Sequence, residues 1–363
     1  MNRKPSPWLR SGCALAVTGM AACADPPPTW TLDPRIEAQS SGSTSLFIGV
    51  HIVDDTTVWI SGTGGAWART VDGGNTWQTG VVPGADSLQF RDVHAIDAAN
   101  AWVLSIGNGP LSRIYRTSDG GATWTLQFMN DEPRAFFDCF DFWDADHGIA
   151  FGDSFDGAFP IVQTSDGGTT WTAVPASRLP PANDGEGGFA ASGTCLVTAG
   201  PGTAWIGTGA SERGARVLRT TDRGQSWTIA ETPIVKGGSR GITTLAFRDT
   251  LNGAALGGDI AQPDSMTDNV ALTSDGGRTW GPGGRPAFSG AVYGAAWVPR
   301  APSPTLIAAG PRGLSVSVDG GLAWSPLDTL NHWSVAFAAP DRGWAVGPGG
   351  RITFIRLFAR VDR

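Results

Sequence analysis

Apolar residues in this chain fall in short runs that are separated by glycine and polar residues. No stretch sustains the 3.6-residue apolar period of an amphipathic helix, so we expect helices to be minor. One short run of small and apolar residues, ending in glycine, recurs seven times. The copies are VWISG (58–62), AWVLSIG (101–107), GIAFG (148–152), AWIGTG (204–209), GAALGG (253–258), LIAAG (306–310) and GWAVG (343–347). Such runs predict buried β-strands.

An octapeptide follows six of these runs. The copies are TVDGGNTW (70–77), TSDGGATW (117–124), TSDGGTTW (164–171), TTDRGQSW (220–227), TSDGGRTW (273–280) and SVDGGLAW (317–324). The aspartate can accept backbone N–H bonds across a tight turn, and glycine allows a positive φ there. The tryptophan then fills the space between neighbouring sheets. The turns lack the alternating acids of a calcium loop, so we expect no metal site.

The spacing of the octapeptides predicts the architecture. Their aspartates are 44 to 56 residues apart, which is typical of propeller blades with four short strands each. The seventh apolar run lacks an octapeptide and lies near the C-terminus, whereas an isolated TWTL (29–32) near the N-terminus resembles the strand after each octapeptide. The sequence therefore predicts an all-β, seven-bladed β-propeller over residues 29–363, closed by the N-terminal strand pairing in the last blade.

Candidate binding residues gather where the innermost strands begin. In a propeller these ends meet at one channel mouth, on the face opposite the octapeptide turns. We expect a ligand or partner site there, with aromatic residues such as Phe136, Phe189 and Trp333 as an apolar floor. The polar candidates are Arg91, Asp138, Glu186, Arg216, Arg240, Tyr293 and His332. Longer loops at 152–159, 209–217 and 257–269 fall on the same face and predict a raised rim that includes Asp153.

The stretch PPANDGEGGFAASGT (180–194) breaks the repeat at this mouth. We expect it to link the third blade to the fourth and to place Glu186 beside Asp138 and Arg240. Asp138 and Glu186 could then act as the acid and base of a hydrolase. The alternative is that each carboxylate anchors a loop through hydrogen bonds.

Charge narrows the choice of partner. The 363 residues carry 26 Lys+Arg against 33 Asp+Glu, a net charge of −7, and include 51 Gly and 16 Trp. An acidic chain disfavours nucleic acid as a partner. No residue pattern indicates a cofactor, and SGTGGAW (61–67) lies in a hairpin rather than in a dinucleotide-binding turn. We expect a monomer that binds a protein complex or a glycan.

The first residues resemble an export signal. Arg3, Lys4 and Arg10 precede the apolar run GCALAVTGMAAC (12–23), which is too short to span a bilayer. MAAC (20–23) resembles a bacterial lipobox. We therefore expect a signal peptide over 1–22, lipidation of Cys23 and a tether over 23–28 on a periplasmic-side outer-membrane lipoprotein; the alternative is a plain signal peptide and a periplasmic protein.

Two further cysteines, Cys139 and Cys195, fall in apolar strand patterns. In an oxidising compartment they could form a disulfide. Because both positions look buried, we expect two free thiols.

The repeats resemble two protein families. The octapeptide array is similar to the Asp-box (BNR) repeat of sialidase propellers, but this chain lacks a sialidase's full catalytic set and has only Tyr115 and Tyr293 as tyrosines. With its apolar runs and GWAVGPGGRI (343–352), it more closely resembles the photosystem II stability/assembly factor family and its bacterial relatives, some labelled oxidoreductase. This second resemblance spans Trp30 to Leu357. It implies a non-catalytic assembly role, with a glycoside hydrolase as the alternative.

Overall fold

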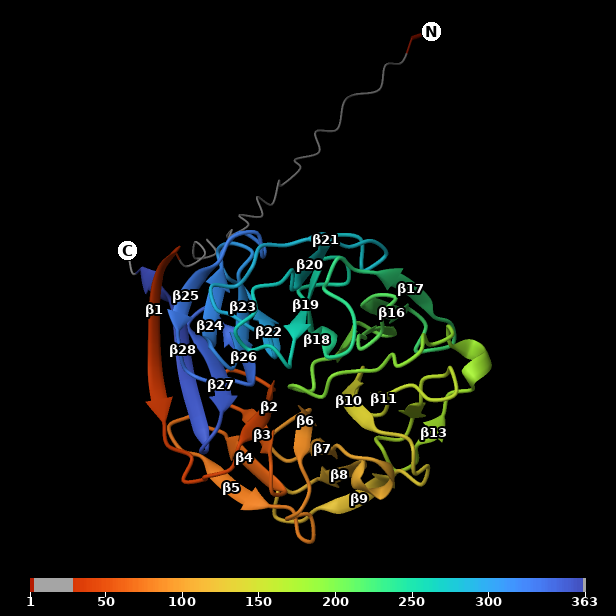
Figure 1. The fold of residues 1–363 in the computed structure, drawn as a ribbon. Helices are drawn as coiled ribbons and strands as arrows, with labels where there is room; N and C mark the ends of the chain where they lie inside the picture. The colour runs from red at the N-terminus through yellow and green to blue at the C-terminus, as the bar shows by residue number, and fades with distance from the viewer. Residues whose placement is uncertain (3–28, 362–363) are drawn as a thin grey trace.

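A computed structural model describes residues 1–2 and 29–361. Within them the chain forms seven four-stranded antiparallel sheets arranged in a ring, with two short 3-10 helices, η1 (Gly109–Leu111) and η2 (Ala176–Arg178) (Figure 1). The predicted seven-bladed propeller is confirmed. The predicted signal peptide, the lipidated Cys23 and the tether lie outside the described residues. No helix in the described part of the chain is long and apolar enough to cross a membrane.

Each sheet forms one blade, and the first strand of each blade lies at the channel. Blade 1 comprises β2 (Phe47–Ile52), β3 (Val58–Gly62), β4 (Ala66–Thr70) and β5 (Gln78–Val81). Blade 2 comprises β6 (Phe90–Ala95), β7 (Ala101–Ser105), β8 (Arg113–Thr117) and β9 (Thr125–Met129). Blade 3 comprises β10 (Phe137–Phe142), β11 (Gly148–Gly152), β12 (Ile161–Thr164) and β13 (Thr172–Ala173). Blade 4 comprises β14 (Leu196–Ala199), β15 (Thr203–Gly207), β16 (Arg216–Thr220) and β17 (Thr228–Glu231). Blade 5 comprises β18 (Arg240–Phe247), β19 (Gly253–Asp259), β20 (Val270–Thr273) and β21 (Gly281–Pro282). Blade 6 comprises β22 (Gly294–Trp297), β23 (Leu306–Gly310), β24 (Gly313–Ser317) and β25 (Ser325–Asp328).

Blade 7 joins the two ends of the chain. Its strands β26 (Ser334–Ala339), β27 (Arg342–Gly347) and β28 (Arg351–Val361) are completed by β1 (Thr29–Gln39), which pairs antiparallel with β28 on the outside. The predicted closure by the N-terminal strand is thus confirmed. Oε1 of Gln39 also accepts hydrogen bonds from the indoles of Trp77 in blade 1 and Trp344 in blade 7, so β1 connects the last blade to the first.

The octapeptide turns share one hydrogen-bond pattern. In the first, Asp72 accepts bonds from the hydroxyl of Thr70 at 2.8 Å and from the amide of Thr76 at 2.9 Å, while the amide of Gly74 donates to Thr70. The same set recurs at Asp119, Asp166, Asp222, Asp275 and Asp319. The hydroxyl and the amide of Thr76, followed by the hydroxyl of Thr70, lower the pKa of Asp72 to about 2, so its carboxylate stays charged and in place.

The core lies between neighbouring blades rather than in the channel. Trp59, Trp102, Trp205 and Trp344 on the second strands are fully buried. Each packs against the next blade, as Trp205 does by stacking on Phe247 with ring centroids 3.6 Å apart. Burial of such large side chains supplies most of the stabilising free energy of a fold with little helix.

Cys139 and Cys195 form a disulfide, with Cα atoms 6.1 Å apart. The expectation of two free thiols is therefore wrong. Cys139 lies on β10 and Cys195 directly precedes β14, and because these innermost strands are neighbours in the ring, their buried side chains meet. Burial alone could not distinguish a pair from two thiols, because the pairing depends on which strands become neighbours.

Candidate functional site

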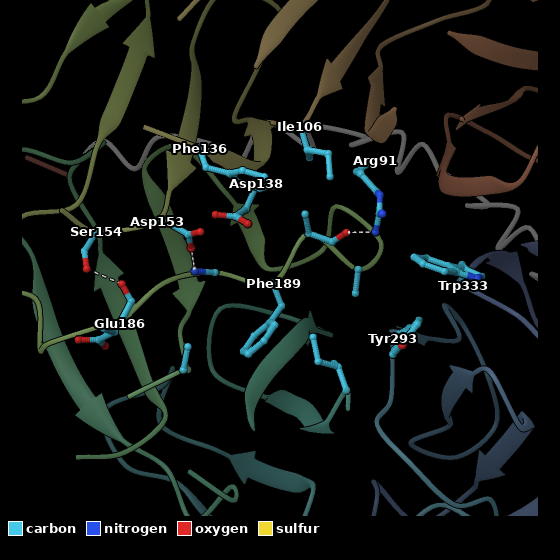
Figure 2. A pocket seen from close by; sticks show the side chains of 16 residues that line it. Arg91, Ile106, Phe136, Asp138, Asp153, Ser154, Glu186, Phe189, Tyr293 and Trp333 are labelled. Atoms are coloured by element: carbon cyan, nitrogen blue, oxygen red, sulfur yellow. Dashed lines mark hydrogen bonds between the residues drawn. The ribbon is translucent and has the colours of Figure 1, made fainter. Parts of the chain in front are cut away.

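A cavity of about 540 Å³ lies at the mouth of the channel. Strand register in blade 3 places this cavity on the face opposite the octapeptide turns. Phe137, at the start of β10 and beside the cavity, is opposite Gly152. Phe142, at the other end of β10, is level with Thr164, where an octapeptide begins. The lining residues are Arg91, Ile106, Phe136, Asp138, Asp153, Ser154, Gly185, Glu186, Gly188, Phe189, Ala190, Ala191, Ala210, Ile260, Tyr293 and Trp333 (Figure 2). They come from blades 2 to 7 and from the segment between blades 3 and 4.

The residues 185–194, here called the mouth segment, run across this opening. The side chain of Arg91 donates to the carbonyl of Ala190 at 2.8 Å, and the amide of Gly188 donates to Oδ1 of Asp153 at 3.0 Å. Farther along, the hydroxyl of Ser192 donates to the carbonyl of Tyr293. Blades 2, 3 and 6 therefore each hold the mouth segment in place.

Two carboxyl groups meet on one side of the cavity. Asp138 is 2% exposed, and Asp153 is half-buried. Burial, followed by the repulsion of Asp153, raises the pKa of Asp138 well above its usual value. Burial likewise raises the pKa of Asp153 to about 6, despite the amide bond from Gly188. Gly188 contacts both groups: its amide donates to Asp153, and a Cβ added to it would lie 2.9 Å from Oδ2 of Asp138. Because both pKa values are raised, the pair retains a proton more readily than two exposed carboxyl groups would.

Aromatic rings and a cation form the opposite side. The guanidinium of Arg91 lies over the ring of Trp333, with 4.9 Å from its carbon to the ring centroid. Tyr293 packs edge-on against Trp333, with centroids 5.0 Å apart. Burial lowers the pKa of Arg91 from its usual value, but a guanidinium remains charged at any physiological pH. The cavity thus has an acidic side and a cationic, aromatic side.

Glu186 does not join the acidic side. Its carboxylate accepts bonds from Nε and Nη2 of Arg216, from the hydroxyl of Thr208 and from the amide of Asn183. Its side chain is fully buried and points away from Asp138 (Figure 2). The expectation that Glu186 lies beside Asp138 and Arg240 is therefore wrong, because Arg216 on β16 binds this carboxylate instead.

The remaining candidates stand apart from the cavity lining. Arg240 donates from Nε to Asp259 at 2.8 Å and is half-exposed. His332 is completely buried, with Nε2 2.9 Å from Oδ2 of Asp328. Of the seven polar candidates, the structure brings four to the cavity wall: Arg91, Asp138, Glu186 and Tyr293.

Sequence reasoning missed the pairing of Asp138 with Asp153. Asp153 directly follows the apolar run 148–152, and the hairpin register that places Gly152 opposite Phe137 brings the two aspartates together. Strand pairing could have revealed this contact. Across the described residues, no three His, Cys, Asp or Glu side chains are grouped so as to hold a metal ion.

Fold and site together define a seven-bladed β-propeller with a ligand-sized cavity at one mouth of its channel. The sequence matches no protein-family model and no curated protein. Among solved structures it is similar to "YCF48 bound to D1 peptide" (TM-score 0.60, 19% identity, covering 90% of this chain and 97% of that one). It is also similar to YCF48 from Cyanidioschyzon merolae (TM-score 0.63, 16% identity, 88% and 98% covered) and to the WD40 domain of Pan2 from Neurospora crassa (TM-score 0.60, 11% identity, 88% and 91% covered). At these identities the likeness shows a shared fold.

Proposed function

We propose that this protein is a non-catalytic binding propeller that holds a segment of a partner protein at its channel mouth. The observation that carries this proposal is the 540 Å³ cavity, which combines apolar walls with a few convergent polar groups, as ligand sites do. The similar YCF48 structure that contains a D1 peptide shows that a propeller of this fold can hold a peptide.

The geometry gives no support to a glycoside hydrolase acting through Asp138 and Glu186. Such enzymes need two carboxyl groups that face the substrate about 5 to 10 Å apart. Both oxygens of Glu186 are occupied by Arg216, Thr208 and Asn183.

We also propose that the protein is exported and anchored through Cys23. The buried disulfide between Cys139 and Cys195 supports export, because disulfides persist in oxidising compartments and are rare in the cytosol. Mass spectrometry of the purified native protein tests the anchor: a diacylated or triacylated Cys23 is expected, and an unmodified chain that begins after residue 22 would contradict it.

The binding proposal is tested with a displayed random-peptide library panned against the purified protein. Selected peptides are expected to lose binding on Trp333→Ala, which removes one wall of the cavity. Leu322→Ala is the matched control, because this 63% exposed side chain lies in an octapeptide turn on the other face. Peptides that bind both variants equally, or the recovery of glycans rather than peptides from a parallel array, would refute the proposal.

A further inference from the structure

The acidic side of the cavity has an unusual feature that peptide binding alone does not explain. No described N–H or O–H group donates to Oδ2 of Asp138, although this oxygen is buried. A buried carboxylate oxygen without a donor is costly. The raised pKa of Asp138 reduces this cost, because the carboxyl group can hold a proton. The carboxyl pair is therefore incompletely satisfied in the free protein.

We propose that Asp138 and Asp153 bind the cationic end of a basic peptide side chain, an arginine or a lysine, which displaces a proton from the pair. This inference rests on the proposed function and specifies its ligand. Both aspartates line the cavity, and Asp153 is the half-buried member whereas Asp138 is almost fully buried, so we expect Asp153 to make the first contact.

The exchange conserves charge. In the free protein the pair holds one proton and one negative charge. When a guanidinium or ammonium group enters, the O–H bond of the carboxylic acid breaks, the proton leaves to solvent, and two carboxylates accept the ligand's N–H bonds. A planar guanidinium suits two adjacent carboxylates because its donors form a fixed fork.

The other charges around the cavity leave this position open to a cation. Arg91, from β6, is held on the opposite side by Trp333 and the carbonyl of Ala190, and its attraction is the weakest of the influences on the pKa of Asp138. Glu186 is neutralised by Arg216 from β16. Tyr293, which precedes β22, has a pKa raised by burial and stays neutral. Asp138 and Asp153 are therefore the acidic groups of the cavity lining that are free to accept a ligand's charge.

The rest of the cavity suits the stem of such a side chain. Phe136 lies beside the carboxyl pair (Figure 2), and Phe189, whose ring packs against Gly209 and Gly241, lines the same cavity. Their rings would cover the methylenes of an arginine or a lysine, whose long stems bury readily while the charge reaches a polar group. The faces of the rings would also attract the cation.

The test compares two capped peptides, acetyl-Ala-Arg-Ala-amide and its counterpart with citrulline, which has nearly the same shape without the charge. Calorimetric titration of the purified protein at pH 6.5 is expected to show at least about tenfold tighter binding of the arginine peptide. In buffers of different ionisation enthalpy, the heats should reveal release of up to one proton per arginine peptide. Affinity for this peptide, but not for citrulline, should rise between pH 5 and pH 7.

The variants Asp138→Asn and Asp153→Asn should each abolish the proton release and reduce the arginine preference to less than about threefold. Asp156→Asn is the control, because this exposed aspartate lies on the same loop as Asp153 and pairs with Arg134 outside the cavity lining. Circular dichroism establishes that each variant is folded, and the citrulline comparison does not depend on any variant.

Each outcome decides the proposal. Equal affinity for the two peptides, at a site sensitive to Trp333→Ala, would overturn the carboxyl pair as a cation site and leave the binding propeller standing. Binding of neither peptide, together with an unproductive peptide library, would overturn both proposals. Arginine preference without proton release would show that the cation binds elsewhere, and would overturn the inference.

Discussion

Asp138 and Asp153 illustrate how one contact can control the charge of a site. No described cation forms an ion pair with either carboxyl group, and burial outweighs the attraction between Asp138 and Arg91, so the pKa values of both aspartates rise instead of falling. An acid whose pKa is higher in the folded than in the unfolded chain stabilises the fold at low pH. That stabilisation is lost as the pH rises through the folded value.

This gives the first prediction, for the free energy of unfolding as a function of pH. For Asp153 the loss should extend from about pH 4 to about pH 6, because its pKa is raised from 3.8 to about 6. Asp138→Asn keeps the shape and removes the ionisation, so it should stabilise the protein at pH 7 by on the order of 1–2 kcal/mol and flatten the curve. Urea unfolding from pH 4 to pH 8 measures both. A curve equally steep in the variant would contradict the raised pKa values of this pair.

Glu186 makes a second prediction at the residue scale. Glu186→Gln removes the charge that pairs with the buried guanidinium of Arg216 and should destabilise the protein by roughly 3 kcal/mol. In contrast, Asp264→Asn should lower the free energy of unfolding by less than about 1 kcal/mol, because the side chains of Asp264 and its partner Arg312 are both exposed. Thermal unfolding compares them. If the two variants are equally stable, Glu186 does not hold the mouth segment.

At the scale of elements, the mouth segment depends on the absence of side chains. A Cβ at Gly187 would collide with Oδ1 of Asp153, and a Cβ at Gly188 would lie 2.9 Å from Oδ2 of Asp138. The segment can therefore cross the carboxyl pair only as bare backbone.

The third prediction concerns this close approach. Gly187→Ala should displace the segment from Asp153 and destabilise the protein by about 1–3 kcal/mol. The control is Gly281→Ala, since a Cβ at Gly281 meets nothing within 4 Å. Chemical unfolding measures stability, and hydrogen exchange of the Gly188 amide measures its bond to Asp153. An unchanged exchange rate for Gly188 would show that the segment tolerates the added methyl.

The elements also show what could be predicted from sequence. The octapeptide turns were predictable because every bond of the pattern joins residues within four positions of each other, as from Thr70 to Gly74. The place of the mouth segment at the channel opening was also predictable, from the break in the repeat. The partner of Glu186 was not, because Arg216 lies thirty residues farther along the chain. A loop tied down by distant side chains leaves no local pattern.

At the scale of the whole molecule, ring closure relies on a single side chain as well as on strand pairing. Gln39 on β1 accepts bonds from tryptophans of two blades. Gln39→Ala leaves both indole N–H groups without this acceptor.

The fourth prediction is that Gln39→Ala lowers the free energy of unfolding by about 1–3 kcal/mol. Gln78→Ala is the control, because this side chain is exposed and bonds only to Arg69 among the described residues. Differential scanning calorimetry compares the variants. A Gln39 variant as stable as the control would mean that strand pairing alone closes the ring.

The pairing of β1 with β28 also fixes where the N-terminal strand begins relative to the channel mouth. The turn that joins β27 to β28 lies beside the mouth. Thr29 lies opposite Val361, at the other end of β28. The chain thus enters the propeller at the perimeter and away from the opening (Figure 1). An N-terminal attachment to a surface would hold the ring by its rim, leaving the mouth turned outward to meet a partner in solution.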